Sequence, residues 1–178
     1  MELITRRLRL RPFTLADHDA IHAIYADPEV MRYVGAGPHA TRAETAAALR
    51  TYADVLARRG YSFLAVTERE GGAILGDAGL HPFGGSGPDV EIGYTLARDA
   101  WGKGYATEAA EALVAHAFTT LGLARVVAQV EPANAASRHV LEKLGMRAEG
   151  QRLAYGRPHV LYVLEATPRE SPRSSPPR

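Results

Sequence analysis

A short glycine-containing segment joins a predicted strand to the most regular helical pattern of the chain. The segment is Trp101-Gly102-Lys103-Gly104, and from Gly104 onward the apolar positions recur at helical spacing. The first N–H groups of a helix lack intrahelical partners, and glycines let the backbone approach a large anion closely. The helix dipole adds a favourable potential, so the segment predicts a phosphate or pyrophosphate site.

Two common nucleotide-binding motifs do not fit this segment. A dinucleotide-binding turn requires a third glycine where Thr107 stands and an acidic residue about 20 residues further on, and both are missing. A P-loop requires GxxxxGK followed by Ser or Thr, and the chain contains no such string. A flexible helix start remains the structural alternative to an anion site.

The remaining patterns predict an α/β chain with a mixed sheet. Alternating or β-branched runs predict strands over residues 8–13, 61–67, 74–81, 90–96, 125–130, 146–154 and 160–166. Helical spacing predicts helices over residues 15–26, 41–59, 104–121 and 135–144, with a short helical stretch over 29–33. Thr14 is a predicted N-cap, Gly60 and Gly145 are predicted helix ends, and the turn at Gly71-Gly72 predicts a hairpin.

Length and composition limit the architecture and the partners. A chain of 178 residues can bury one sizeable core, so we expect a single domain over residues 1–166 and a mobile Pro/Ser/Arg-rich tail over 167–178. The net charge of +1 gives no general field for a nucleic acid. The start of the chain does not fit a secretory signal, and cysteine is absent. We therefore expect a cytoplasmic protein without a membrane partner.

Two strings carry a family resemblance. The run EIGYTL followed by WGKGYATEA resembles the acetyl-coenzyme A (acetyl-CoA) pyrophosphate motif of the GNAT acetyltransferases, and the second string is typical of their RimJ/RimL branch. The resemblance implies a GNAT-like mixed, mostly antiparallel central sheet flanked by helices, with an acyl-CoA cleft where strands splay. It also implies cofactor contacts from Tyr94, Thr95, Leu96, Trp101, Gly102, Lys103, Gly104, Tyr105, Ala106 and Thr107. Asp99 departs from the Gln or Arg that the wider family often has there.

Further stretches extend the resemblance. The strings TRRLRLRPF and DPEVMRYV are similar to the amino-terminal region of the RimJ/RimL branch. Residues 131–146 resemble the second cofactor motif, N-x-x-S followed by a Lys-Leu-Gly helix end. This match implies that Asn134 and Ser137 meet the pantetheine arm and sulfur, and that Arg138 reaches a CoA phosphate. From the residues alone, Asn134 is equally a helix N-cap and Arg138 equally a solvated helix charge.

The chemistry of amine acetylation needs a base and an oxyanion donor. A protonated amine must lose a proton before it attacks a thioester. The resemblance implies that Glu91, on the strand EIGYTL, takes this proton directly or through water; an exposed strand-end carboxylate is the structural alternative. Backbone N–H groups near Tyr94 and Thr95 are candidates for the oxyanion donor. Much of the family has a tyrosine where this chain has Leu141, so either Ser137 orients the sulfur or CoA leaves as a thiolate.

The resemblance implies acetyl transfer from acetyl-CoA to a primary amine in a ternary complex, without a covalent enzyme intermediate. The acceptor is either a protein N-terminal α-amine or a small-molecule amine such as an antibiotic or polyamine. A non-catalytic acyl-CoA-binding regulatory module is the alternative, favoured by Leu141 and Asp99. The sequence is compatible with a homodimer.

Two weaker side-chain patterns involve histidines and tyrosines. His18 and His22 stand four residues apart on a predicted helix, but no third ligand is evident, so we expect no metal. His81 and three tyrosines could contact the acceptor, although a turn position or core packing is the default interpretation; the tyrosines are Tyr33, Tyr155 and Tyr162.

Overall fold

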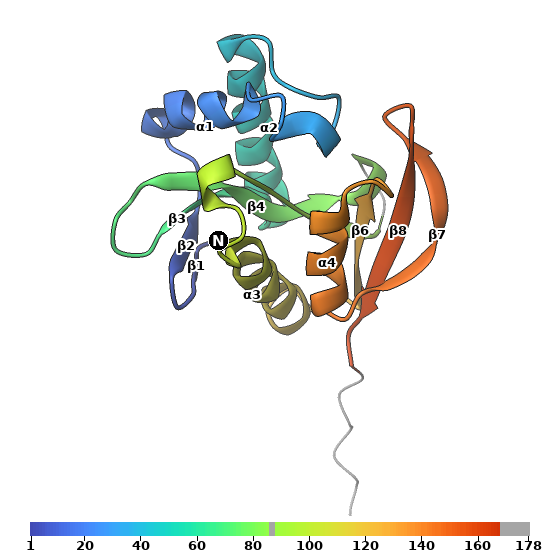
Figure 1. Cartoon of the computed structure of the whole chain (residues 1–178). Coiled ribbons are helices and arrows are strands. Elements are labelled where there is room, and N and C mark those ends of the chain that lie inside the picture. Colours follow the sequence, from blue (N-terminus) through green and yellow to red (C-terminus); the bar gives the residue numbers. More distant parts are fainter. Residues whose placement is uncertain (86–87, 168–178) are drawn as a thin grey trace, which may run out of the picture.

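A mixed sheet of eight strands forms the frame of the part of the chain that the computed structural model describes, residues 1–85 and 88–167. Apart from residue 167, the predicted mobile tail lies outside these residues. The spatial order is β1-β2-β3-β4-β5-β6-β8-β7 (Figure 1). All neighbours pair antiparallel except β5 and β6, which are parallel. The strands are β1 (Leu3–Ile4), β2 (Leu8–Arg11), β3 (Phe63–Glu68), β4 (Ile74–Pro82), β5 (Val90–Leu96), β6 (Arg125–Val130), β7 (Arg147–Ala154) and β8 (Arg157–Glu165).

Helices cover both faces of this sheet. Figure 1 shows α1 (His18–Tyr25) and α2 (Arg42–Arg59) on one face, and α3 (Tyr105–Thr119) and α4 (Ala135–Lys143) on the other. Short 3₁₀ turns lie at Leu15–Asp17, Met31–Tyr33, Phe83–Gly85 and Arg98–Ala100. This arrangement confirms the mixed, mostly antiparallel sheet flanked by helices. In the part of the chain that the structure describes, every helix is too short or too polar to span a lipid bilayer.

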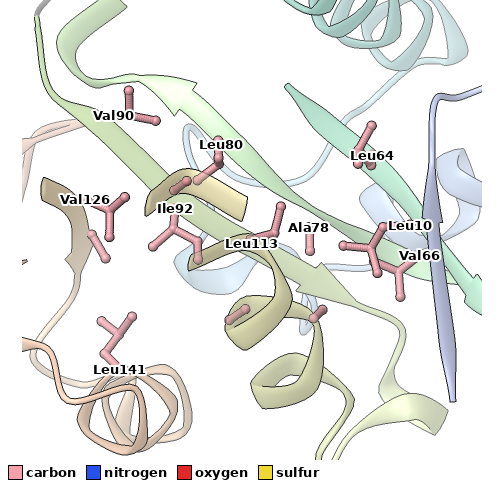
Figure 2. Close-up of a cluster of buried hydrophobic side chains, with 14 of the residues drawn as sticks. Leu10, Leu64, Val66, Ala78, Leu80, Val90, Ile92, Leu113, Val126 and Leu141 are labelled. Atoms are coloured by element: carbon pink, nitrogen blue, oxygen red, sulfur yellow. The ribbon is translucent and has the colours of Figure 1, made fainter. Parts of the chain in front are cut away.

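The main core lies between the sheet and α3. Alternate residues of five strands point toward α3, because successive side chains of a strand face opposite sides. Figure 2 shows them as one apolar layer over Leu113, which is fully buried. Burying such a leucine contributes about 1.5–3 kcal/mol. The layer comprises Leu10, Leu64, Val66, Ala78, Leu80, Val90, Ile92 and Val126.

The opposite face of β4 and β5 carries the polar residues of the site. The register pairs Asp77 with Thr95, Gly79 with Gly93, and His81 with Glu91. These residues alternate with the core residues, so they point toward α1 and α2. A smaller apolar cluster lines those helices, comprising Ile21, Ile24, Tyr25, Val30 and Met31. The two helices therefore cover part of this face.

Local signals set the helix boundaries. The side chain of Thr41 accepts a hydrogen bond from the N–H of Glu44, and α2 ends at Gly60, whose φ of +76° is left-handed. The predicted N-cap Thr14 forms a capping box with Asp17, but a 3₁₀ turn precedes α1. The two-residue strand β1 was not predicted, because it is too short to show a period.

Candidate active site

The site is built where β5 and β6 diverge. β5 pairs with β4 over its whole length but shares only the register pair Glu91 and Val127 with β6, within the residues described. Beyond that pair the two parallel strands separate. The first turns of α3 and α4 lie beside the resulting opening, since their residues line the same cleft as the end of β5.

A cleft of about 580 Å³ occupies this opening. Its walls come from the end of β5, the glycine-containing turn, the start of α3 and the first turns of α4. Among the predicted cofactor residues, those that line it are Tyr94, Thr95, Leu96, Trp101, Gly102, Gly104, Tyr105, Ala106, Thr107, Asn134 and Ser137. The structure thus brings together two motifs that are some thirty residues apart in the sequence.

Lys103 and Arg138 do not line this cleft among the described residues. Lys103 is exposed. The guanidinium of Arg138 donates to the Tyr162 hydroxyl at 3.3 Å and to the Pro132 carbonyl at 3.3 Å, and it lies 3.9 Å from Glu142. Its direct contact with a CoA phosphate stays a prediction that would require the side chain to move.

The turn itself has the backbone conformation that an anion site needs. Gly102 and Gly104 have φ of +71° and +77°, values that L side chains rarely adopt. A Cβ at Gly102 would meet nothing within 4 Å, so the backbone there borders open space. Gly104 is the N-cap of α3, whose first N–H groups have no intrahelical partner. These residues fit a pyrophosphate held by backbone amides.

The connection between β1 and β2 braces this turn. Arg7 donates from Nη1 to the Lys103 carbonyl at 2.8 Å and from Nε to Glu108 at 2.6 Å. Glu108 also accepts from the Thr5 hydroxyl at 2.6 Å and from the Arg7 backbone N–H at 2.8 Å. Sequence reasoning missed this contact, because it joins residues 101 positions apart. It fixes the start of α3 to the first hairpin of the sheet.

A second cavity of about 450 Å³ lies against the α1–α2 face of β4 and β5. The described residues that line it include three carboxylic acids and neither lysine nor arginine. Its walls are also rich in aromatic rings, which attract cations at their faces. This lining favours a positively charged or amine-bearing guest; the acids are Glu44, Asp77 and Glu91, and the rings are Tyr25, Tyr33, Tyr52, Phe63, Tyr94 and Tyr155.

Glu91 lies in this second cavity and is not a free strand-end carboxylate. Burial raises the pKa of Glu91 to about 7. The Gln129 amide Nε2 donates to its Oε2 at 3.4 Å, and this contact opposes the rise in the pKa. A carboxylate with a pKa near neutrality is a stronger base than an ordinary glutamate and is still ionised in part at pH 7.

Asp77 is a second buried acid, which sequence reasoning missed. It is 1% exposed, and the Tyr25 hydroxyl donates to its Oδ2 at 2.7 Å. Thr95 lies directly across the ladder from Asp77. Burial raises the pKa of Asp77 to about 7. A carboxyl group inside the apolar run ILGDAGL is the sequence signal that could have revealed it.

The two cavities share a boundary. The residues that line both are Tyr33, Val34, Tyr94, Thr95, Asn134 and Ser137. Asn134 caps α4, since its Oδ1 accepts from the Ser137 N–H at 3.1 Å. The Tyr94 hydroxyl donates to the Ser137 carbonyl at 3.1 Å. A ligand in one cavity can therefore react with a ligand in the other only beside these residues.

Of the histidines and tyrosines considered as weaker candidates, some line the second cavity and the others have structural contacts. His81 lines the second cavity with Tyr33 and Tyr155, whereas Tyr162 is 4% exposed within the core. His18 contacts the Arg42 carbonyl at 3.0 Å, and His22 contacts the Thr45 hydroxyl at 2.9 Å. Among the residues described, no group of three or more metal-ligating side chains lies close enough to hold a metal ion.

Comparisons with known proteins show which proteins this chain resembles in sequence and in fold. The family described as "Acetyltransferase (GNAT) domain" matches residues 7–147. The chain is 32% identical over 148 residues to the Uncharacterized N-acetyltransferase p20 of Bacillus licheniformis, with 83% of each chain covered. An acetyltransferase from Agrobacterium tumefaciens superposes with a TM-score of 0.81 at 29% identity, covering 93% of this chain and 95% of that chain.

A third similarity concerns the fold alone. The ribosomal-protein-S5-alanine acetyltransferase from Vibrio fischeri superposes with a TM-score of 0.76 at 19% identity, covering 93% of this chain and 96% of that chain. The same family is indicated by the extent of the family match, by the identity to p20 and by the diverging parallel strands. The chain belongs to the GNAT acetyltransferase family.

Proposed function

We propose that this chain transfers the acetyl group of acetyl-CoA to a primary amine by direct attack in a ternary complex. The observation that carries the proposal is the meeting of two cavities at the divergence of β5 and β6, with the base Glu91 on the side opposite the glycine-containing turn. Held in adjoining cavities, a thioester and an amine need no covalent enzyme intermediate. We take residues 1–166 to act as one domain.

Backbone groups would hold the acetyl donor. The amides of Gly102, Gly104 and the first turn of α3 suit its pyrophosphate, because they are unpaired and lie at the positive end of the helix dipole. Asn134 and Ser137 line the cleft where the pantetheine arm would run. When bound, acetyl-CoA supplies a thioester carbonyl that an amine can attack.

The chain's own groups would then accept the proton of the amine and stabilise the charge of the oxyanion. Glu91 would take the proton of the amine, directly or through water, because its pKa of about 7 matches this task at neutral pH. The N–H groups of β5 alternate in direction, and those of Tyr94 and Leu96 point away from β4 beyond the register pair with β6, so they are available to stabilise the oxyanion, whereas the N–H of Thr95 points toward β4. Each of these donors is fixed before the reaction, as efficient electrostatic stabilisation requires.

Two acceptor classes fit this mechanism. The RimJ/RimL-like motifs support a protein N-terminal α-amine, and the fold similarity to a ribosomal-protein acetyltransferase is compatible with it. The second cavity with its acidic and aromatic lining suits a small-molecule amine equally.

Release of CoA from acetyl-CoA in the presence of peptides and small amines tests the proposal. The chain has no cysteine, so a thiol reagent reports CoA without background from the protein. We expect amine-dependent release by the wild type. Tight binding of acetyl-CoA with no release across the whole panel would instead identify a non-catalytic acyl-CoA-binding module.

A further inference from the structure

The hydroxyl of Tyr94 occupies a special position, at the boundary of the two cavities. Its ring belongs to β5 and points to the same side as Ile92, because side chains alternate along a strand. Ile92 packs in the core, but at Tyr94 the neighbouring strand β6 has already diverged. The ring therefore reaches α4, where its hydroxyl donates to the carbonyl of Ser137 at 3.1 Å.

The sulfur of an acetyl donor must come close to this boundary. The thioester has to touch both the cofactor cleft and the acceptor cavity, and only six of the described residues line both. Thr95 lies on the acceptor side of β5, where it faces Asp77 across the β4–β5 ladder. Leu141, one turn beyond Ser137 on α4, is 2% exposed and has no donor to offer.

The bond that Tyr94 makes can be exchanged without leaving a buried group unpaired. The carbonyl of Ser137 lies in the regular helix α4, where it is placed to accept from the N–H of Leu141. If the hydroxyl of Tyr94 turns to another acceptor, that carbonyl keeps its helical partner, so the cost of an orphaned buried acceptor is avoided.

The acidity of the Tyr94 hydroxyl decides whether it transfers its proton or only donates a hydrogen bond. Burial raises the pKa of the Tyr94 hydroxyl above its ordinary value, so the phenol stays protonated through the neutral range. A free thiol has a pKa of about 8.5, below the raised pKa of the Tyr94 hydroxyl. The proton therefore stays on the tyrosine oxygen, and the group acts as a hydrogen-bond donor.

We propose that the Tyr94 hydroxyl donates a hydrogen bond to the sulfur of CoA and stabilises the thiolate that leaves. This inference rests on the proposed acetyl-CoA site. When the C–S bond breaks, its electron pair moves to sulfur, the amine proton passes to Glu91 and then to water, and Tyr94 keeps its own proton. A hydrogen bond to a charged acceptor is about twice as strong as one to a neutral group.

Binding measurements test this role without turnover. Dissociation constants of CoA and of desulfo-CoA, which lacks the sulfur atom, are measured by calorimetry from pH 7 to pH 9. The ratio of the two removes every pH effect that does not involve the thiol. If Tyr94 lowers the pKa of the bound thiol by one unit, CoA should bind about sixfold more tightly at pH 9 than at pH 7, relative to desulfo-CoA.

Tyr94→Phe should abolish this pH dependence and leave the affinity for desulfo-CoA near the wild-type value. Tyr61→Phe is the matched control, because Tyr61 is 8% exposed in the core and lines neither cavity; it should behave as the wild type. Ser137→Ala tests the neighbouring hydroxyl in the same way.

Each other outcome overturns the inference. A flat ratio in the wild type would do so even if the variant failed to fold, as would an unchanged pH dependence in Tyr94→Phe. Loss of the dependence in Ser137→Ala alone would assign the role to Ser137. Failure of the wild type to bind either ligand would overturn the proposed function as well, whereas absence of turnover with normal binding would count against the transferase proposal only.

Discussion

Glu91→Gln should slow acetyl transfer and stabilise the fold at the same time. Burial raises the pKa of Glu91 from 4.5 to about 7, so the folded chain resists its ionisation. One pKa unit corresponds to about 1.4 kcal/mol, and allowing for partial solvent screening the ionised carboxylate costs about 2–3 kcal/mol of stability above pH 7. A carboxyl with a raised folded pKa contributes its full stability below pH 4.5 and loses it as the pH rises through 7.

The unfolding free energy of wild type and variant measures this cost. Glutamine has the size of glutamate and cannot ionise, so the variant should be more stable by about 2–3 kcal/mol at pH 8 and by less than about 1 kcal/mol at pH 5. Urea titrations at the two pH values give the difference. Glu70→Gln, at an exposed position, serves as the control and should show neither effect.

The kinetic half of this prediction uses the same proteins. Removal of the base should lower kcat about a hundredfold or more while leaving the affinity for acetyl-CoA near the wild-type value. The wild-type kcat/KM should fall toward acid pH, approaching tenfold for each unit below 7, because Glu91 becomes protonated. A stability difference that does not change with pH, or a variant with wild-type kcat, would refute the reasoning.

Three further changes examine the cofactor cleft. Gly104→Ala should reduce the rise in melting temperature caused by acetyl-CoA, whereas Gly60→Ala, at nearly the same left-handed φ but remote from the cleft, should cost similar stability and leave that rise intact. Asn134→Asp should keep the helix cap and lose the amide donor, so differential scanning calorimetry should show a native-like fold with weaker acetyl-CoA binding. Asn134→Ala should weaken binding equally, and it alone should also lose about 1 kcal/mol of unfolding free energy. Glu108→Ala should lower the unfolding free energy, measured in urea, by about 2–3 kcal/mol, because Thr5 and Arg7 lose their partner. A loss no larger than that of an exposed control such as Glu70→Ala would contradict the bracing role.

The fold was largely predictable, because its signals are local. The predicted bounds of β5 and β6 match the structure, and α2 differs by one residue at its start. In each case the period, the capping threonine or the terminal glycine lies within the element itself. The start of α1 was less well predicted, since the capping box of Thr14 and Asp17 encloses a 3₁₀ turn before the helix.

The site was predictable only where it is contiguous in sequence. The glycine-containing turn and the Asn134–Ser137 motif each carry their pattern within a few residues, and both line the cleft. The contacts of Asp77 with Tyr25 and of Glu108 with Arg7 join residues 52 and 101 positions apart. No period links such pairs, so only tertiary packing reveals them.

The single register pair between β5 and β6 has a consequence for how the free protein exchanges its amide hydrogens. Past Ile92, the N–H groups of β5 that point away from β4 have no strand to bond in the described chain, although Thr95 and Leu96 beside them are buried. Exchange with solvent deuterium at these few amides should therefore be fast beside well-protected neighbours on the same strand. A bound acyl-pantetheine that accepts from them would slow exchange there, so the deuterium pattern along β5 would map the ligand's path through the sheet amide by amide.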